Sequence, residues 1–192
     1  MGDSIRSVIR ERRSIRSFRS DDIPTDLLLE LLQDASFAPN HKLREPWSFI
    51  LFRDNAKEKL CTAALKKAVE SEKMKSLPQD KQVEKISKMK TTYQSCPVHI
   101  LVLCKKSETP KVQLEDFAAT SAFIQNFQLL AWEKGIGTVW KTPVFMEEPS
   151  FRAELGVDPE KMVVGLLHIG YPMEIPKVKD RSNIKFKVEI RD

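Results

Sequence analysis

The sequence has few cysteines and no long apolar run, and both absences limit where the protein can work. Cys61, Cys96 and Cys104 are an odd number with no short-range pairing, which favours a reducing compartment over a secreted, disulfide-bonded protein. No stretch approaches the roughly 18 consecutive apolar residues that a membrane-spanning helix needs. The chain is charged from Asp3 onward and lacks the apolar segment of a signal peptide. We therefore expect a cytoplasmic protein with no membrane partner.

Two catalytic motifs are also absent. No Gly-x-Ser-x-Gly sequence is present, so a serine hydrolase has no nucleophile motif here. The segment Gly135-x-Gly137-x-x-Trp140 lacks a third glycine and follows a predicted helix instead of a strand. Both features argue against a Rossmann domain with permanently bound NAD.

A metal site is only loosely indicated. Cys96, His99 and Cys104 lie near one another in the sequence and loosely resemble a metal-binding set. However, adjacent positions of a strand point to opposite faces, and no second group of cysteines and histidines completes a tetrahedral set. We therefore expect no bound metal.

The composition is that of an ordinary globular protein. Hydrophobic residues make up 41% and charged residues 31% of the 192 residues, enough for one domain with its own core. The 32 Lys and Arg residues exceed the 27 Asp and Glu residues and give a net charge of +5. This modest excess favours anionic ligands without requiring nucleic acid.

The spacing of apolar residues predicts alternating helices and short strands without internal repeats. Asp3 or Ser4 can cap the first helix. Gly135 is expected to end the long helix, and Pro78 to interrupt a lysine-rich helical segment. Helices are predicted over about 5–9, 25–38, 56–92, 114–134 and before Gly156, and strands over 47–52, 98–104, 138–141, 162–169 and 184–190.

Two predicted elements bear on assembly. The helix over 114–134 is apolar on most sides, so it needs a second cover that a twin subunit would supply; the alternative is burial within one subunit. The last strand, 184–190, alternates apolar and charged residues and follows a polar stretch, 174–183. A strand on such a tether can pair with its own sheet or with a partner's edge. Our hypothesis is that it crosses to the partner.

A group of arginines near the beginning of the chain is the first candidate for a binding site. Arg12, Arg13, Ser14 and Arg16 lie where a helix gives way to extended chain. Guanidinium groups form paired hydrogen bonds with phosphate, and a hydroxyl adds a donor. These side chains can therefore converge on one anion. The alternative is a solvated basic helix end, which also suits the helix dipole.

From this point the sequence resembles the nitroreductase family, and it is most similar to the family's compact branch. The resemblance covers almost the whole chain, and its four motifs follow one another in the family's order. They are Arg12-Arg13-Ser14-x-Arg16 with Phe18; Ala38-Pro39-Asn40-His41 with Pro46-Trp47; Gly135 to Thr142; and Leu155-Gly156 with Gly170-Tyr171-Pro172.

The resemblance implies an α+β fold with a mixed, mainly antiparallel central sheet flanked by helices. It implies one FMN-binding domain over 1–192, with a lysine-rich helical cover at about 56–92 and a C-terminal extension at about 174–192. The cover has a simpler alternative, a solvated helical hairpin. Members of the family act as homodimers with active sites at the subunit interface, so the C-terminal strand is expected to be exchanged between subunits.

The function implied is that of an NAD(P)H-dependent flavin oxidoreductase. NAD(P)H is a transient co-substrate that delivers hydride to FMN, and a nitroaromatic, quinone or similar small molecule then accepts the electrons. No side chain acts as a nucleophile or general base. A flavoenzyme of the same fold with different chemistry is an alternative: dehydrogenation, dehalogenation or flavin cleavage. A nucleic-acid binder is disfavoured, because only Phe18 offers a stacking aromatic beside the arginines.

The resemblance also implies the cofactor-binding residues. Some would hold FMN within one subunit, and two would reach FMN bound mainly by the partner. The implied set is Arg12, Arg13, Ser14, Arg16, Phe37, His41, Trp140, Lys141 and Thr142.

Individual roles within this set follow from chemistry. Reduced flavin carries negative charge at its pyrimidine edge, and Arg16 or Lys141 is suited to stabilise it. Phe37 and His41 are the residues expected to reach the partner's cofactor. The alternative to a cofactor role is that Trp140 is an ordinary core residue and that His41 is an ordinary surface histidine. No clear basic pair in the C-terminal tail aligns with the phosphate ligands that the family has late in its sequence.

Overall fold

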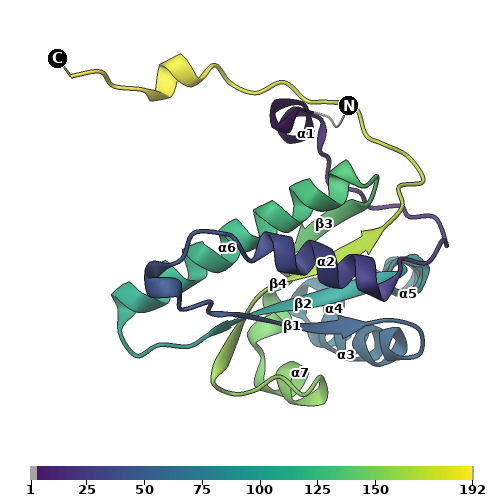
Figure 1. The fold of residues 1–192 in the computed structure, drawn as a ribbon. Coiled ribbons are helices and arrows are strands. Elements are labelled where there is room, and N and C mark those ends of the chain that lie inside the picture. The colour runs from purple at the N-terminus through teal and green to yellow at the C-terminus, as the bar shows by residue number, and fades with distance from the viewer. Residues whose placement is uncertain (1–3, 192) are drawn as a thin grey trace.

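A four-stranded sheet forms the centre of the computed structural model, which describes residues 4–191 (Figure 1). The strands are β1 (Trp47–Phe52), β2 (Val98–Lys105), β3 (Gly137–Lys141) and β4 (Lys161–Gly170). Their order is β1-β2-β4-β3, and every neighbouring pair is antiparallel. The predicted α+β class with a mainly antiparallel sheet is confirmed. Among the described residues, parallel pairing occurs only as a single bridge between Ser14 and Thr138.

Helices cover both faces of this sheet. They are α1 (Ile5–Glu11), α2 (Thr25–Ala35), α3 (Ala56–Glu70), α4 (Glu72–Lys75), α5 (Gln79–Ser95), α6 (Pro110–Glu133) and α7 (Pro149–Glu154), with short 3₁₀ helices η1 (His41–Leu43), η2 (Val144–Glu147) and η3 (Ile184–Lys187). One core joins the sheet to α2 and α6, and a second joins it to α3, α5 and α7 (Figure 1). No helix among residues 4–191 is long and apolar enough to cross a membrane.

The local sequence explains most of these bounds. The Ser4 hydroxyl accepts from the Ser7 amide at 3.3 Å and so caps α1. Helix α6 begins at Pro110, earlier than expected, because proline is tolerated in the first helical turn. It gives way to Gly135, whose φ of +74° suits glycine at a helix C-terminus. The central strand β2 is buried at every position except Lys105, which accounts for its continuous apolar sequence.

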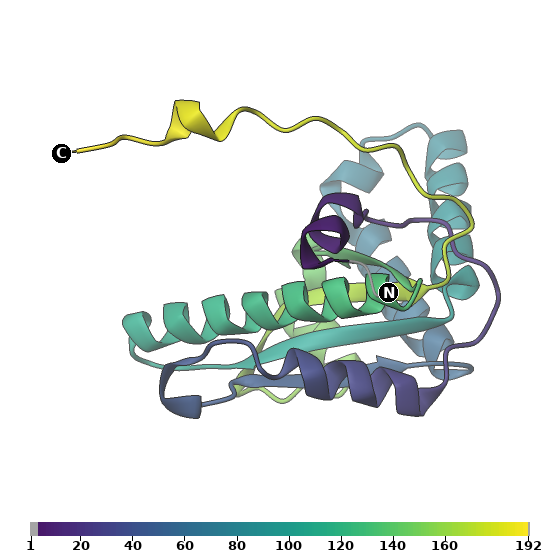
Figure 2. The same ribbon diagram turned by 45° about the horizontal axis from the view of Figure 1, so that its top comes forward.

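The predicted C-terminal strand is wrong for the single chain. Residues 184–187 form η3, and the segment around it is exposed, with Phe186 at 88%. Figures 1 and 2 show this tail leaving the body of the molecule. Alternation of apolar and charged residues makes a strand only beside a sheet edge, and the tail passes no edge of its own chain. Exchange with a partner stays a prediction.

Helix α6 is buried on only part of its surface. Phe123 and Phe127 are fully enclosed, whereas Leu114 is 69% and Phe117 37% exposed. The alternative that one subunit buries the whole apolar surface of this helix therefore does not hold.

Candidate active site

Arg12, Arg13 and Arg16 belong to the segment 12–19, which follows α1 and runs along the edge of the sheet. We call this segment the N-terminal arm. The Ile15 amide donates to the Thr138 carbonyl at 3.0 Å, and the Arg19 amide donates to the Tyr171 carbonyl at 2.9 Å. Ile15 and Phe18 point into the protein and are buried. Ser14 and Arg16, on either side of Ile15, are consequently exposed.

The arm approaches β3 closely because of one glycine. A Cβ at Gly137 would lie 2.5 Å from Ile15 Cγ1, far inside van der Waals contact. Glycine at this position therefore fixes how near the arm, and with it Arg16, lies to β3.

Three guanidinium groups gather at the start of the arm. Burial is the main cause that lowers the pKa of Arg12, and the charges of Arg13 and Arg181 lower it further. Arg13 donates through Nη1 to the carbonyls of Arg10 and Arg12, at 2.7 and 2.6 Å, while its Nε and Nη2 are buried without partners among residues 4–191. Buried donors without acceptors are costly, so this cluster suits an anion.

Arg181 is a basic residue that sequence reasoning missed. The predicted site had no assigned phosphate ligand from the tail, yet the structure brings Arg181 close enough to act on the pKa of Arg12. The only signal in the sequence was the basic character of the tail around Lys179 and Arg181.

Two adjoining cavities lie along α5: one of about 530 Å³ against the end of β3, and one of about 470 Å³ against Arg16 and Ser17. Because both include Lys88 and Thr92, we treat them as one feature, the α5 groove. One end contains Lys141 and Thr142, and the other contains Arg16. The remaining wall is supplied by Ser17, Glu84, Lys85, Ser87, Met89, Thr91, Tyr93, Ser95, Pro143 and Phe145.

The groove is rich in positive charge. Burial lowers the pKa of Lys141; Cys96 opposes this shift, and the nearby Arg16 adds to it. The two cations that the sequence nominated are thus brought together, and α5 adds Lys85 and Lys88. The sequence had marked these two only as members of a lysine-rich helix. The α5 groove can therefore stabilise an electron-rich ring edge.

Trp140 points the other way. Its Nε1 donates to the Val164 carbonyl at 3.3 Å, and its indole packs on the core beneath α2 and α6. A Cβ at Gly165 would overlap this indole, so Gly165 makes room for it. Trp140 lines neither cavity of the α5 groove, because adjacent strand residues face opposite sides of the sheet.

Phe37 and His41 belong to the loop between α2 and β1, whose 3₁₀ helix η1 lies at the opposite end of the molecule from α5 (Figures 1 and 2). Phe37 is 84% exposed, and His41 borders a separate cavity of about 460 Å³ against α6. An ion pair between Arg44 and the buried Asp116, at 2.8 Å, fastens this loop to α6. One chain therefore does not unite these two residues with the α5 groove.

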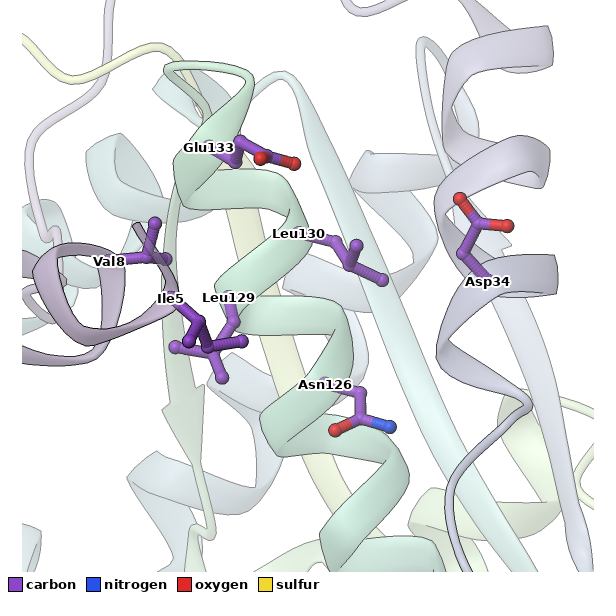
Figure 3. Close-up of a pocket in the computed structure, with 7 residues that line it drawn as sticks. All are labelled: Ile5, Val8, Asp34, Asn126, Leu129, Leu130 and Glu133. Carbon is purple, nitrogen blue, oxygen red and sulfur yellow. The ribbon is translucent and has the colours of Figure 1, made fainter. Parts of the chain in front are cut away.

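A further cavity of about 340 Å³ lies between α1, α2 and α6. Figure 3 shows Ile5 of α1 meeting Leu129 of α6, while Asp34 of α2 lies on the far side of Leu130. Ile5 is 72% exposed, so this apolar surface is open in the single chain.

The chain is similar to known proteins in both sequence and structure. Residues 9–171 match the model of the nitroreductase family, a span that begins before Arg12 and ends at Tyr171. A Bacillus subtilis protein named "Putative NAD(P)H nitroreductase YfhC" is 39% identical over an alignment of 184 residues that covers 94% of this chain and 91% of that protein.

Solved structures share the fold. A nitroreductase-like family protein from Bacillus cereus has a TM-score of 0.88 at 39% identity, covering 100% of this chain and 98% of that one. An iodotyrosine deiodinase, bound to FMN and 3-iodo-L-tyrosine, has a TM-score of 0.74 at 22% identity and covers 98% of both chains; this likeness concerns the fold alone. The resemblance found in the sequence motifs is confirmed, and the chain belongs to the nitroreductase family.

Proposed function

We propose that this chain is an FMN-dependent oxidoreductase that takes hydride from NAD(P)H and reduces a small acceptor such as a nitroaromatic or a quinone. The observation that carries the proposal is the α5 groove. It joins Arg16 and Lys141, two cations from distant segments, at opposite ends of one lysine-bearing wall. The match to the nitroreductase family and to a putative NAD(P)H nitroreductase supports the same enzyme class and the same co-substrate.

The residues present fit FMN. Its phosphate needs donors, and the Arg12, Arg13 and Arg181 cluster holds positive charge together with the unpartnered Nε and Nη2 of Arg13. Its ring system needs a flat apolar surface, and Met89, Tyr93 and Phe145 line one side of the groove. When bound, FMN accepts hydride and passes electrons on.

The protein's own residues supply orientation and charge. We infer that Arg12, Arg13 and Ser14 hold the phosphate end, while Lys141, Lys88 and Arg16, spread along the α5 groove, supply positive charge to the pyrimidine edge. Cations there stabilise the negative charge that develops on reduction. NAD(P)H and acceptor would use the same space in turn, which is a ping-pong mechanism.

The α3–α5 hairpin acts as the cover of this single domain. Helix α5 contributes Lys85, Lys88 and Met89 to the groove, which supports the cover over the alternative of a solvated hairpin. Residues on such a cover choose among acceptors by shape and charge.

We further propose a homodimer in which the partner completes each site. Phe37 and His41 lie on a different part of the chain from the groove, so a second copy would have to present them. The exposed Leu114, Phe117 and Ile5 give the partner an apolar surface to cover.

One alternative has an observation behind it. The fold likeness to an iodotyrosine deiodinase with bound FMN favours reductive dehalogenation as a second activity. Turnover of a nitrophenol and of an iodophenol by the same preparation, with NADPH or NADH, compares the two reactions directly.

The decisive test is flavin content and reduction. The purified protein should be yellow, retain FMN, and show parallel double-reciprocal lines for NAD(P)H and acceptor. Lys88→Ala should slow flavin reduction, whereas Lys90→Ala, which removes an exposed lysine of the same helix that lines neither cavity of the groove, should not. A colourless protein that takes up no FMN, or equal effects of the two variants, would contradict the proposal.

A further inference from the structure

A buried thiol and two buried imidazoles meet beneath the α5 groove. Cys96 follows α5, and His99 of β2 stands directly opposite His168 of β4 in the strand register. All three side chains are fully buried, and one potential ligand atom from each lies within 4.8 Å of the others. We call these residues the thiol–imidazole cluster.

The histidine pairing explains why the sequence did not reveal this cluster. Cys96 and His99 were recognised, but the third member lies 69 residues after His99 and is brought in by the register of β2 with β4. Opposite residues of an antiparallel pair project from the same face of a sheet. The expectation of no metal rested on strand positions that face opposite sides of the sheet and on the lack of a second group of ligands; His168 provides a further ligand on the same face as His99.

His99 is oriented as a metal-binding histidine usually is. Its Nε2 lies 2.9 Å from the Tyr93 carbonyl oxygen, which can only accept, so Nε2 carries the proton. The lone pair is then on Nδ1, which has no hydrogen-bond partner within residues 4–191. Metal-ligating histidines almost always donate their other N–H to a carbonyl or carboxylate in this way.

His168 strengthens the case because neither of its ring nitrogens has a partner in the described chain. The rings themselves are well packed. The centroid of the Tyr93 ring lies 5.4 Å from that of His99 and 5.3 Å from that of His168, and the two imidazoles pack edge to face with their centroids 4.4 Å apart. Packing does not satisfy three buried ring nitrogens, however, and such atoms normally bind something.

We propose that Cys96, His99 and His168 bind one thiophilic transition-metal ion, copper(I) or zinc(II). A thiolate with two imidazoles is a ligand set for these ions and not for magnesium or calcium, which prefer oxygen. Metal–ligand bonds of about 2.0 to 2.3 Å can join atoms up to roughly 4 Å apart, so small side-chain rotations complete the site.

When a metal binds, the Cys96 sulfur exchanges its proton for the metal ion. The Cys96 thiol now faces the carbonyl oxygens of Val98 and Ile169, at 3.2 and 3.4 Å. When sulfur bonds to the metal, this proton leaves to solvent and no electrons are transferred. Lys57 and Lys141 add positive charge nearby. A monovalent ion with one thiolate leaves the site neutral, which favours copper(I) over zinc(II).

The consequence for the fold is local. A bound ion would tie the C-terminal end of α5 to both central strands, and Tyr93, in the last turn of that helix, also lines the α5 groove. The site thus fixes one wall of the groove without touching the flavin chemistry.

The test uses the flavin-loaded, tag-free protein, dialysed against a chelator and reloaded with zinc sulfate or, without oxygen, with a copper(I) salt. We expect about one ion per chain and metal-edge X-ray absorption showing one sulfur and two nitrogen ligands, a readout that flavin colour does not disturb. Zinc and copper samples reveal which ion binds more tightly through the same residues.

Variants decide between this site and adventitious binding. Cys96→Ser and His168→Gln should each weaken metal binding by at least about tenfold, the smallest loss typical even of an outer partner of a metal site. The matched controls Cys61→Ser and Cys104→Ser remove buried thiols outside the cluster and should leave it unchanged. Flavin content confirms that each variant is folded. Folded wild-type protein without stoichiometric metal, or undiminished binding in Cys96→Ser, overturns the proposal.

Discussion

At the scale of single residues, Lys141 has the clearest electrostatic signature. Burial lowers its pKa below the ordinary lysine value of 10.5. Its ammonium therefore loses its proton at a pH where exposed lysines are still charged, and the charge that stabilises reduced flavin is then lost. We expect kcat/KM for NAD(P)H to fall as the pH rises through this lowered pKa, since kcat/KM reports groups of the free enzyme.

Two variants of Lys141 separate this effect from other titrations. Lys141→Arg keeps its charge at high pH, so its rate should persist to higher pH than that of the wild type. Lys141→Ala should reduce flavin about a hundredfold more slowly, as removal of one such donor typically does, with a smaller loss of FMN affinity. Stopped-flow absorbance measures both, and an unchanged alkaline limb in Lys141→Arg would exclude Lys141 as its cause.

The arginine cluster gives a prediction about binding. Each charge-assisted hydrogen bond to phosphate contributes about 1.5 to 3 kcal/mol, so Arg12→Ala, Arg13→Ala and Arg181→Ala should each weaken FMN binding by roughly tenfold to a hundredfold. Flavin fluorescence titration measures the dissociation constant. Arg191→Ala, on the same tail but paired with Glu189 at 2.9 Å, is the control and should bind normally. Undiminished FMN retention in an Arg12/Arg13 double alanine variant would contradict the phosphate role.

How far the sequence predicts site residues depends on how they are brought together. Arg16 and Lys141 could be nominated because each belongs to a contiguous motif, and the structure places both in the α5 groove. Three other residues could not be nominated, because their neighbours depend on the packing of a helix (Lys88), the path of the tail (Arg181) and the register of two strands (His168). Local patterns carry no information about such long-range contacts.

At the scale of elements, the contact of the N-terminal arm with β3 depends on Gly137. Gly137→Ala would force Ile15 away, and overpacking of this kind costs about 1 to 3 kcal/mol. Because Ile15 lies between Ser14 and Arg16, FMN affinity should fall together with the free energy of unfolding. Chemical denaturation and flavin titration measure the two quantities.

A second glycine supplies the control for that experiment. Gly135 has a φ of +74°, and a Cβ there would meet nothing within 4 Å. Gly135→Ala should destabilise the protein through backbone conformation alone, by about 1 to 2 kcal/mol, while leaving FMN affinity unchanged. If both variants lose stability but neither loses FMN, the arm does not position the cofactor site.

The elements themselves were largely predictable, for a physical reason. Strands β1 and β2 and helix α2 bury one face or both within this chain, so the spacing of their apolar residues predicts their structure, although α2 ends at Ala35 and the prediction extended it to residue 38. The segment 184–190 has an equally clear alternation and yet is no strand here, because its pattern specifies a pairing that the single chain does not offer.

At the scale of the whole molecule, several exposed apolar surfaces call for a second copy. The groove between α1, α2 and α6, the outer surface of α6 with Leu114 and Phe117, and the tail with Phe186 and Ile190 are all uncovered. Scattered exposed apolar residues are normal, but these are gathered on a groove, a long helix and an extended tail. A twofold dimer in which each tail lies on the other subunit would cover all three.

Removing residues 182–192 tests this arrangement while retaining Arg181. Burial of a side chain such as Phe186 contributes about 1.5 to 3 kcal/mol, so the truncation should raise the dimer dissociation constant by more than about a hundredfold. Phe186→Ser alone should raise it about tenfold or more, whereas Lys185→Ser, its charged neighbour, should have little effect. Analytical ultracentrifugation measures these dissociation constants.

Since Phe37 and His41 would come from the partner, FMN should be lost at the same protein concentration at which the dimer dissociates. A truncated protein that stays fully dimeric excludes the exchanged tail, and flavin that remains bound to a monomer excludes the shared site.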